Sequence, residues 1–253
     1  MSTLAAKLKK MYWEQESLPL EYRLAHSNRA GDSPYIRYEL NADDAPVGGK
    51  WQDRHAYGNN PKLSWAPSNA VYDSTLKMWD CTASGAYLNA NIGSMDLGNH
   101  FAVYISGLFY RPVKDTWYSM VVDLGSVVGT DRNIGFIYGK YLNDNIYKYS
   151  DCNWKLKGNN SNPGLIHITD QRYPDWTVEP FRLEYFLSIS QKNETYDKAT
   201  YVINGTKVVV PVDVPKVSYN SWQIKAGYIG RGHVGGVSSG KGYYERICFF
   251  VYD

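Results

Sequence analysis

The chain has 253 residues and nearly balanced charge, with 27 Lys and Arg against 25 Asp and Glu and a net charge of +2. Charges of both signs are interspersed, so the sequence offers neither a nucleic-acid-binding surface nor a basic membrane patch, and no apolar run is long enough to span a bilayer. With 23 Tyr, 8 Trp and 22 Gly, and few helix-favouring runs, the composition favours a single β-rich body.

Residues 3–16 are predicted to form an amphipathic helix. Its apolar positions follow the i, i+4, i+7 and i+8 spacing of one helix face, and they are Leu4, Leu8, Met11 and Tyr12. A helix of this length is marginal in water by itself, so its apolar face needs a surface to pack on. That surface is either the protein's own β domain or a partner, such as another protein or a neighbouring copy of the chain.

Residues 17–34 contain Pro19, Gly31 and Pro34 among scattered polar residues, which predicts a linker or extended arm. We therefore expect residues 1–34 to form an N-terminal helix and arm that serves attachment or oligomerisation. Residues 35–253 are then the β domain.

From residue 35 onward the sequence predicts short β-strands separated by Gly, Pro, Asn and Asp clusters. About a dozen such strands, with no helical pattern between them, predict an all-β antiparallel sandwich. The clearest of them are residues 35–40, 101–110, 117–123, 134–138, 164–169 and 181–190.

The last quarter of the chain contains the strongest local signals. Asn204-Gly205 lies between two β-rich runs and predicts a hairpin, because both residues tolerate the positive φ of a type I′ turn. Residues 243–253 form an apolar, aromatic strand at the end of the sequence, and a strand this apolar is expected to be buried in a sheet.

Several short motifs resemble the laminin-G-like or concanavalin A-like jelly-roll superfamily, of the kind found on bacteriophage fibres and decoration proteins. They are Tyr201-x-x-Asn204-Gly205, Ile229-Gly230, Ile247-x-x-Phe250-x-Tyr252-Asp253, Trp51-x-Asp53, Gly58-Asn59 and Tyr87-Leu88. The resemblance covers about residues 35–253. It implies an antiparallel jelly-roll β-sandwich, a fold used mostly to hold glycans.

No catalytic motif is recognisable in the sequence. Glycanases of this fold class place their carboxylates in a Glu-x-Asp-x-x-Glu strand, and none of the eight Glu residues forms that pattern. Glu184 lies on a predicted strand, but its alternating neighbours Arg182 and Phe186 supply no second carboxylate. The sequence has no G-x-S-x-G elbow, and its five His residues are dispersed singly. We therefore expect a protein that is not an enzyme.

No cofactor is expected either. Asp43-Asp44 and Asn143-Asp144-Asn145 have the oxygen ligands that calcium prefers, although Asp and Asn are also common turn residues. Cys81, Cys152 and Cys248 are widely spaced, which indicates neither a disulfide framework nor a zinc site.

Aromatic residues interleaved with polar ones are the remaining signal of ligand binding. Sugar rings stack their C–H faces on aromatic side chains, while their hydroxyl groups need planar polar partners. The candidate ligand-binding residues are Tyr141, Asp144, Asn145, Tyr147, Arg172, Tyr173 and Trp176. The alternative is that these aromatic residues serve cross-strand packing.

The resemblance, with no signal-peptide core in residues 1–10, implies a virion-associated, surface-exposed protein made in the host cytoplasm. We expect it to bind a cell-surface glycan through the sandwich and other virion proteins through the N-terminal helix, with a trimer as a candidate oligomer. Two alternatives remain open. One is a purely structural capsid or tail assembly protein, and the other is a glycan depolymerase whose carboxylates come from distant loops.

Overall fold

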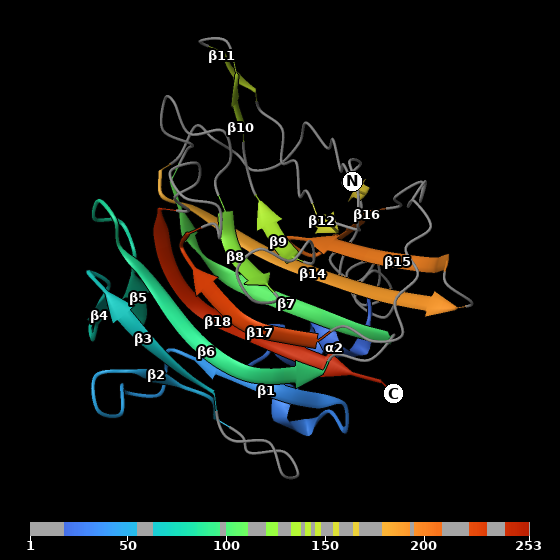
Figure 1. Ribbon diagram of the computed structural model, residues 1–253, viewed down its shortest axis with the longest axis horizontal. Helices are drawn as coiled ribbons and strands as arrows, with labels where there is room; N and C mark the ends of the chain where they lie inside the picture. Colours follow the sequence, from blue (N-terminus) through green and yellow to red (C-terminus); the bar gives the residue numbers. More distant parts are fainter. Residues whose placement is uncertain are drawn as a thin grey trace, which may run out of the picture.

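Two antiparallel β-sheets stack face to face to form a β-sandwich (Figure 1). The computed structural model describes residues 18–54, 63–96, 100–110, 120–125, 133–137, 140–142, 145–147, 154–156, 164–166, 179–192, 195–208, 223–231 and 241–252. For the strands between residues 120 and 166 it describes the backbone. The antiparallel sandwich predicted from the sequence is confirmed.

The larger sheet has eight strands within the described residues, and its last strand lies at its centre. β18 (Gly242–Val251) pairs with β7 along one edge and with β5 and β1 along the other. The prediction that the terminal strand is buried in a sheet is therefore confirmed. The other strands are β1 (Ile36–Asn41), β4 (Val71–Asp73), β5 (Met78–Asp80), β7 (His100–Phe109), β14 (Phe181–Lys192), β15 (Thr195–Ile203) and β16 (Thr206–Val208).

The smaller sheet has six strands within the described residues, in the order β2-β3-β6-β17-β8-β9. Two separate hairpins lie outside both sheets. The six strands are β2 (Trp51–Gln52), β3 (Ser64–Ser68), β6 (Tyr87–Asp96), β17 (Gln223–Ile229), β8 (Met120–Gly125) and β9 (Asn133–Ile137). The hairpins are β10 (Lys140–Leu142) with β11 (Asn145–Tyr147), and β12 (Trp154–Leu156) with β13 (Gly164–Ile166).

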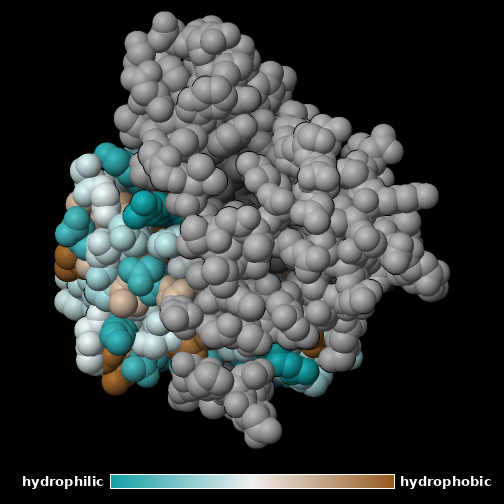
Figure 2. Space-filling model, viewed as in Figure 1, coloured by the Kyte–Doolittle hydropathy of each residue, from teal (hydrophilic) through white to brown (hydrophobic). Residues whose placement is uncertain are grey.

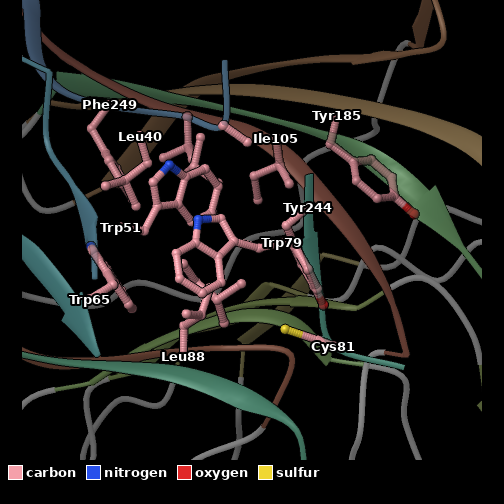
Figure 3. Packing of buried hydrophobic residues seen from close by; sticks show 14 of the residues in the cluster. Leu40, Trp51, Trp65, Trp79, Cys81, Leu88, Ile105, Tyr185, Tyr244 and Phe249 are labelled. Carbon is pink, nitrogen blue, oxygen red and sulfur yellow. The ribbon is translucent and has the colours of Figure 1, made fainter. Parts of the chain in front are cut away.

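The main core lies between the two sheets (Figure 3). Alternate residues of a strand point to one face, so Val103 and Ile105 of β7 meet Leu88 of β6 and Ile229 of β17 across the interface. Three tryptophans of this core, Trp51, Trp65 and Trp79, are at most 2% exposed. Each large apolar side chain buried in this way contributes about 1.5–3 kcal/mol.

The Trp51-x-Asp53 motif has a structural role. The Trp51 indole lies 6.3 Å from that of Trp79 within the core. Two residues on, Asp53 accepts a hydrogen bond of 2.8 Å from the backbone N–H of Glu39 on β1. The motif therefore ties the start of the smaller sheet to the edge of the larger one.

The outer face of the larger sheet is covered by the N-terminal segment. Residues 20–26, expected in the linker or arm, form the helix α2 (Leu20–His26), and a 3₁₀ turn follows as η1 (Ala30–Asp32). Tyr22 and Ala25 share one helix face and pack on the sheet, so burial stabilises a helix too short to form alone. A second apolar cluster results, made of Leu18, Tyr22, Ala25, Ala30, Ile36, Ala102, Tyr104, Phe186, Val202, Cys248 and Phe250.

The hairpin at Asn204-Gly205 is confirmed. Ile203 and Thr206 pair across the turn, and the two central residues have φ of 44° and 78°. Among the described cysteines, Cys81 and Cys248 are free and buried. Within the described part of the chain, no helix is long and apolar enough to cross a membrane.

Candidate functional site

The ligand-binding residues proposed from sequence fall mainly outside the described structure. Tyr141 lies on β10, and Asn145 and Tyr147 lie on β11, so a single hairpin brings their backbones together. Asp144, Arg172, Tyr173 and Trp176 lie outside the described residues, as do Leu4, Leu8, Met11 and Tyr12 of the predicted N-terminal helix. Their grouping into one site remains a prediction.

Arg54 occupies the acidic turn that the sequence offered as a calcium site. Its Nε and Nη2 donate to the two carboxylate oxygens of Asp44 at 2.7 and 3.0 Å, and its Nη1 lies 3.0 Å from Glu39. Asp43 accepts a hydrogen bond of 3.0 Å from the side chain of Asn28. A guanidinium thus supplies the positive charge here. Within the described residues, no group of three or more His, Cys, Asp or Glu side chains could hold a metal.

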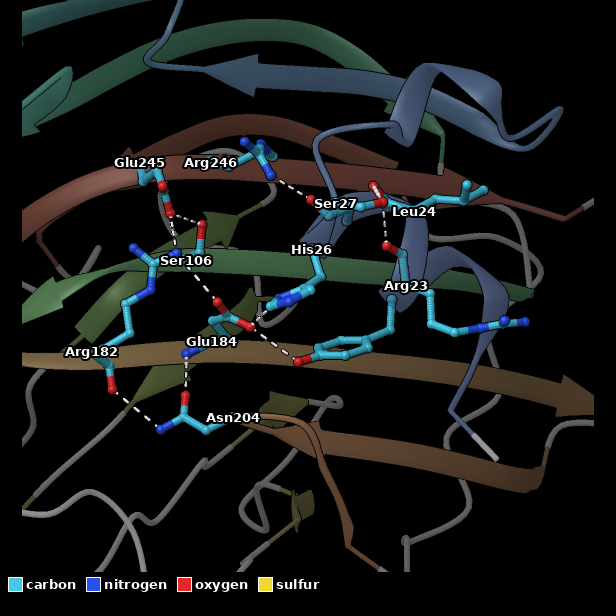
Figure 4. Close-up of polar contacts among 12 residues, drawn as sticks. Arg23, Leu24, His26, Ser27, Ser106, Arg182, Glu184, Asn204, Glu245 and Arg246 are labelled. Carbon is cyan, nitrogen blue, oxygen red and sulfur yellow. Dashed lines mark hydrogen bonds and ion pairs between the residues drawn. The ribbon is translucent and has the colours of Figure 1, made fainter. Parts of the chain in front are cut away.

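A polar cluster lies where α2 meets the outer face of the larger sheet (Figure 4). At its centre is Glu184 of β14, which is 7% exposed. Its Oε2 accepts a hydrogen bond from the Tyr22 hydroxyl at 3.0 Å and lies 2.9 Å from Nδ1 of His26. Its Oε1 lies 3.2 Å from Arg182 Nη2. We call this set, with Ser106 and Glu245 described next, the Glu184 cluster.

A β-bulge brings a second carboxylate to the Glu184 cluster. The pairing of β18 with β7 shifts between Tyr244 and Arg246, which leaves Glu245 as the extra residue of the bulge. Glu245 accepts hydrogen bonds from Arg182 Nη2 and from the Ser106 hydroxyl at 2.8 Å. Two carboxylates from non-adjacent strands therefore converge on one guanidinium.

The hydrogen bonds of the Glu184 cluster hold α2 against the larger sheet. Burial and the neighbouring charge of Glu184 raise the pKa of Tyr22, so its phenol stays protonated and remains a hydrogen-bond donor. Arg246 also donates to the backbone oxygen of Ala25 in the same helix. The helix is thus held by side chains from both β14 and β18.

A different kind of surface lies on the smaller sheet, on the face turned away from the core. Leu88 of β6 and Ile229 of β17 point into the core, so their neighbours Tyr87 and Tyr228 point outward. The two tyrosine rings meet edge to face with centroids 5.8 Å apart. Asn89 is the strand partner of Tyr228, and all three side chains are partly exposed. We call Tyr87, Asn89 and Tyr228 the tyrosine surface.

Arg231 lies beside the tyrosine surface. Its guanidinium carbon is 4.9 Å from the ring centroid of Tyr87 and 5.8 Å from that of Tyr228. Gly230 makes this placement possible. Its φ is +83°, and a Cβ there would lie 3.2 Å from the Cβ of Cys81. The chain therefore turns at Gly230 in a way that other residues rarely adopt.

Sequence reasoning missed this surface. The sequence motifs that include Tyr87-Leu88 and Ile229-Gly230 indicate strands of the sandwich but not which side chains face outward. The available signal was alternation, because Leu88 and Ile229 are the apolar members of their strands and their tyrosine neighbours must then face outward. The pairing of β6 with β17, which makes the two tyrosines neighbours, could not be predicted from the sequence.

The exposed side of the molecule seen in Figure 2 is mainly polar over its described part, with apolar residues scattered in small spots. Such a surface suits a polar ligand better than a large apolar contact.

Comparisons with known proteins give matches in structure. No family model matches the chain, and no curated protein is significantly similar to it in sequence. A Trypanosoma rangeli sialidase in complex with the inhibitor DANA matches with a TM-score of 0.52 and 12% identity, over 98% of this chain and 36% of the sialidase chain. The sialidase in complex with sialic acid gives a TM-score of 0.50 and 11% identity, over 86% and 31% of the two chains.

The binding domain of botulinum neurotoxin DC, in complex with SialylT, matches with a TM-score of 0.55 and 11% identity. The match covers 86% of this chain and 48% of the neurotoxin chain. What these structures share with the chain is the fold. The chain spans well under two thirds of each of them, so their activities bear on it only as proposals.

The prediction that the protein is not an enzyme is contradicted, because sialidases are among the structures that share its fold. That prediction rests on three absences in the sequence: a Glu-x-Asp-x-x-Glu strand, a G-x-S-x-G elbow and grouped His residues. The structure instead brings Glu184 and Glu245 together from β14 and β18, through a bulge that no strand motif reveals.

Proposed function

We propose that the β-sandwich binds carbohydrate, and that the tyrosine surface is part of its binding site. The observation that carries the proposal is the outward, partly exposed pair Tyr87 and Tyr228, with the amide of Asn89 beside it. Tyrosine rings offer flat apolar faces for the C–H groups of a sugar, and an amide offers both a donor and an acceptor for its hydroxyl groups. The fold supports the same function, since it is shared with a sialidase whose structure holds sialic acid.

A glycan array probed with the full chain tests this proposal. The Tyr87→Ala/Tyr228→Ala double variant should lose at least about tenfold in affinity for the glycans that the wild type binds. Tyr35→Ala is the matched control, because Tyr35 is 40% exposed and its ring contacts Tyr252 on another part of the molecule. Unchanged binding by the double variant, or no binding by the wild type, would contradict the proposal.

The residues predicted from sequence, including Tyr147 and Trp176, are proposed as further contacts of the same ligand. The Tyr147→Ala and Trp176→Ala variants test this on the same array. A loss of binding supports an extended site, and wild-type binding by both variants places the ligand elsewhere.

We propose further that the protein is carried on a virus particle, attached through the N-terminal helix predicted for residues 3–16 of the 1–34 segment, and exposed at the surface. The basis is the family resemblance of the sequence. A chain that begins at Leu18 keeps α2, which packs on the sandwich. It should bind glycans as the full chain does but fail to join particles. Incorporation of the shortened chain at the full level would exclude this attachment.

Glycoside hydrolysis is a second candidate function, favoured by the convergence of Glu184 and Glu245 on Arg182. Two carboxyl groups held close together are the usual machinery of glycosidases. Release of reducing sugar from bound glycans by the wild type, lost in Glu245→Gln, would support this function. No release by the wild type would exclude it for the glycans tested.

A further inference from the structure

Arg231 is the cation that the described structure places beside the tyrosine surface. Its guanidinium lies over two tyrosine rings, 4.9 Å from the centroid of Tyr87 and 5.8 Å from that of Tyr228. Cation–π contacts of this kind contribute about 0.5–1 kcal/mol at partly exposed sites. They favour a position of the guanidinium beside the rings before any ligand arrives.

Arg231 differs in its partners from three other arginines of the described structure, although Arg37 and Arg246 donate to backbone oxygens instead of carboxylates. Arg29, Arg54 and Arg182 each form an ion pair with at least one carboxylate. Among the described residues, no carboxylate lies within ion-pair distance of Arg231, whose contacts there are the two tyrosine rings. Its positive charge is therefore not neutralised within the part of the chain that the structure describes.

A guanidinium that rests on an aromatic ring uses its face for that contact. Its N–H groups lie in the plane of the group and point sideways, so they remain available to an acceptor. Two of them in parallel match the two oxygens of a carboxylate, a sulfate or a phosphate. Neutral hydroxyl groups do not require this fork or its charge.

We propose that the carbohydrate bound at the tyrosine surface is an acidic one, and that Arg231 binds its carboxylate or sulfate group. This inference rests on the proposed carbohydrate-binding function and specifies its ligand class. The tyrosines contact the sugar ring, and the arginine selects for the acid. A nucleic acid fits less well, because its repeated phosphates call for several clustered cations and the chain has a net charge of +2.

The test compares neutral glycans with matched acidic partners, using lactose, lactose 3-O-sulfate and sialylated lactose as soluble probes beside the array. The wild type should bind the acidic member of a pair at least about tenfold more tightly, with a preference that weakens as salt is added. In Arg231→Gln this acidic-to-neutral ratio should fall toward one. Arg23→Gln makes the same charge change at an exposed position of α2 and should keep the wild-type ratio.

The outcomes distinguish a failure of the acid-binding role of Arg231 from a failure of carbohydrate binding itself. If the wild type binds neutral and acidic partners equally, or if Arg231→Gln keeps the preference, the acid-binding role is overturned while carbohydrate binding stands. If no glycan binds, both fail. Sulfate-bearing and carboxylate-bearing probes are separate arms, so the result also shows which acid group Arg231 accepts.

Discussion

A few side chains hold α2 on the sheet through hydrogen bonds, and Glu184 makes several of these contacts. It accepts from Tyr22 and contacts His26 and Arg182. Glu184→Gln should lower the free energy of unfolding by about 2 kcal/mol, because bonds to a charged acceptor are replaced by weaker ones. Urea denaturation measures the change. Asp32→Asn breaks an exposed ion pair with Arg29 and should cost less than about 0.5 kcal/mol. Equal effects in the two variants would contradict an anchoring role.

Tyr22 makes stability depend on pH at the alkaline end. Its pKa in the folded state is raised above the ordinary value of 10.0 by burial and by the charge of Glu184. Its contribution is therefore fully present below about pH 10 and decreases as the pH rises above it, by up to about 1.4 kcal/mol per pH unit. Tyr22→Phe should be less stable at neutral pH yet lose less stability on going to about pH 11. An identical alkaline decline in the variant would show that Tyr22 does not contribute to it.

At the scale of elements, the end of β17 decides where Arg231 lies. Gly230→Ala should destabilise the fold by about 1–3 kcal/mol, because φ is +83° and the added Cβ meets Cys81 at 3.2 Å. Gly48→Ala is the control, since its φ is +59° but nothing lies within 4 Å of the added atom. We expect the Gly230 variant alone to weaken acidic-glycan binding. If both variants bind as the wild type does, the turn does not position Arg231.

Elements were more predictable than their contacts. The Asn204-Gly205 hairpin was predictable because Asn and Gly are the residue types that readily adopt the positive φ of a type I′ turn, as both do here. The bulge at Glu245 was not, since it depends on how many residues of β18 oppose β7. The tyrosine surface was missed for a related reason. Tyr87 and Tyr228 are far apart in the sequence, and only the pairing of β6 with β17 makes them neighbours.

Residues 17–34 are predicted to be a linker or extended arm because of Pro19, Gly31 and Pro34, and α2 is too short to contradict that pattern in the sequence. Seven residues do not form a stable helix alone, and their sequence shows little periodicity. What stabilises the helix is the outer face of the larger sheet, where Tyr22 meets Tyr104 and Phe186 edge to face. The packing was visible only once the sheet was assembled.

At the scale of the whole molecule, the two sheets have different surroundings. The larger one is buried on one side by the smaller sheet and is covered on the other by α2 and η1. The smaller one carries Tyr87, Asn89 and Tyr228, all partly exposed, on its outer face. The proposed function therefore uses the outer face of the smaller sheet, while that of the larger sheet holds α2.

A crystal structure of the full chain with an acidic oligosaccharide selected on the array tests the central claim most directly. We predict that the sugar ring lies against Tyr228 or Tyr87 and that its acid group lies within hydrogen-bond distance of the Arg231 guanidinium. A sugar bound at the Glu184 cluster or on another face, with the tyrosine surface unoccupied, would contradict the account.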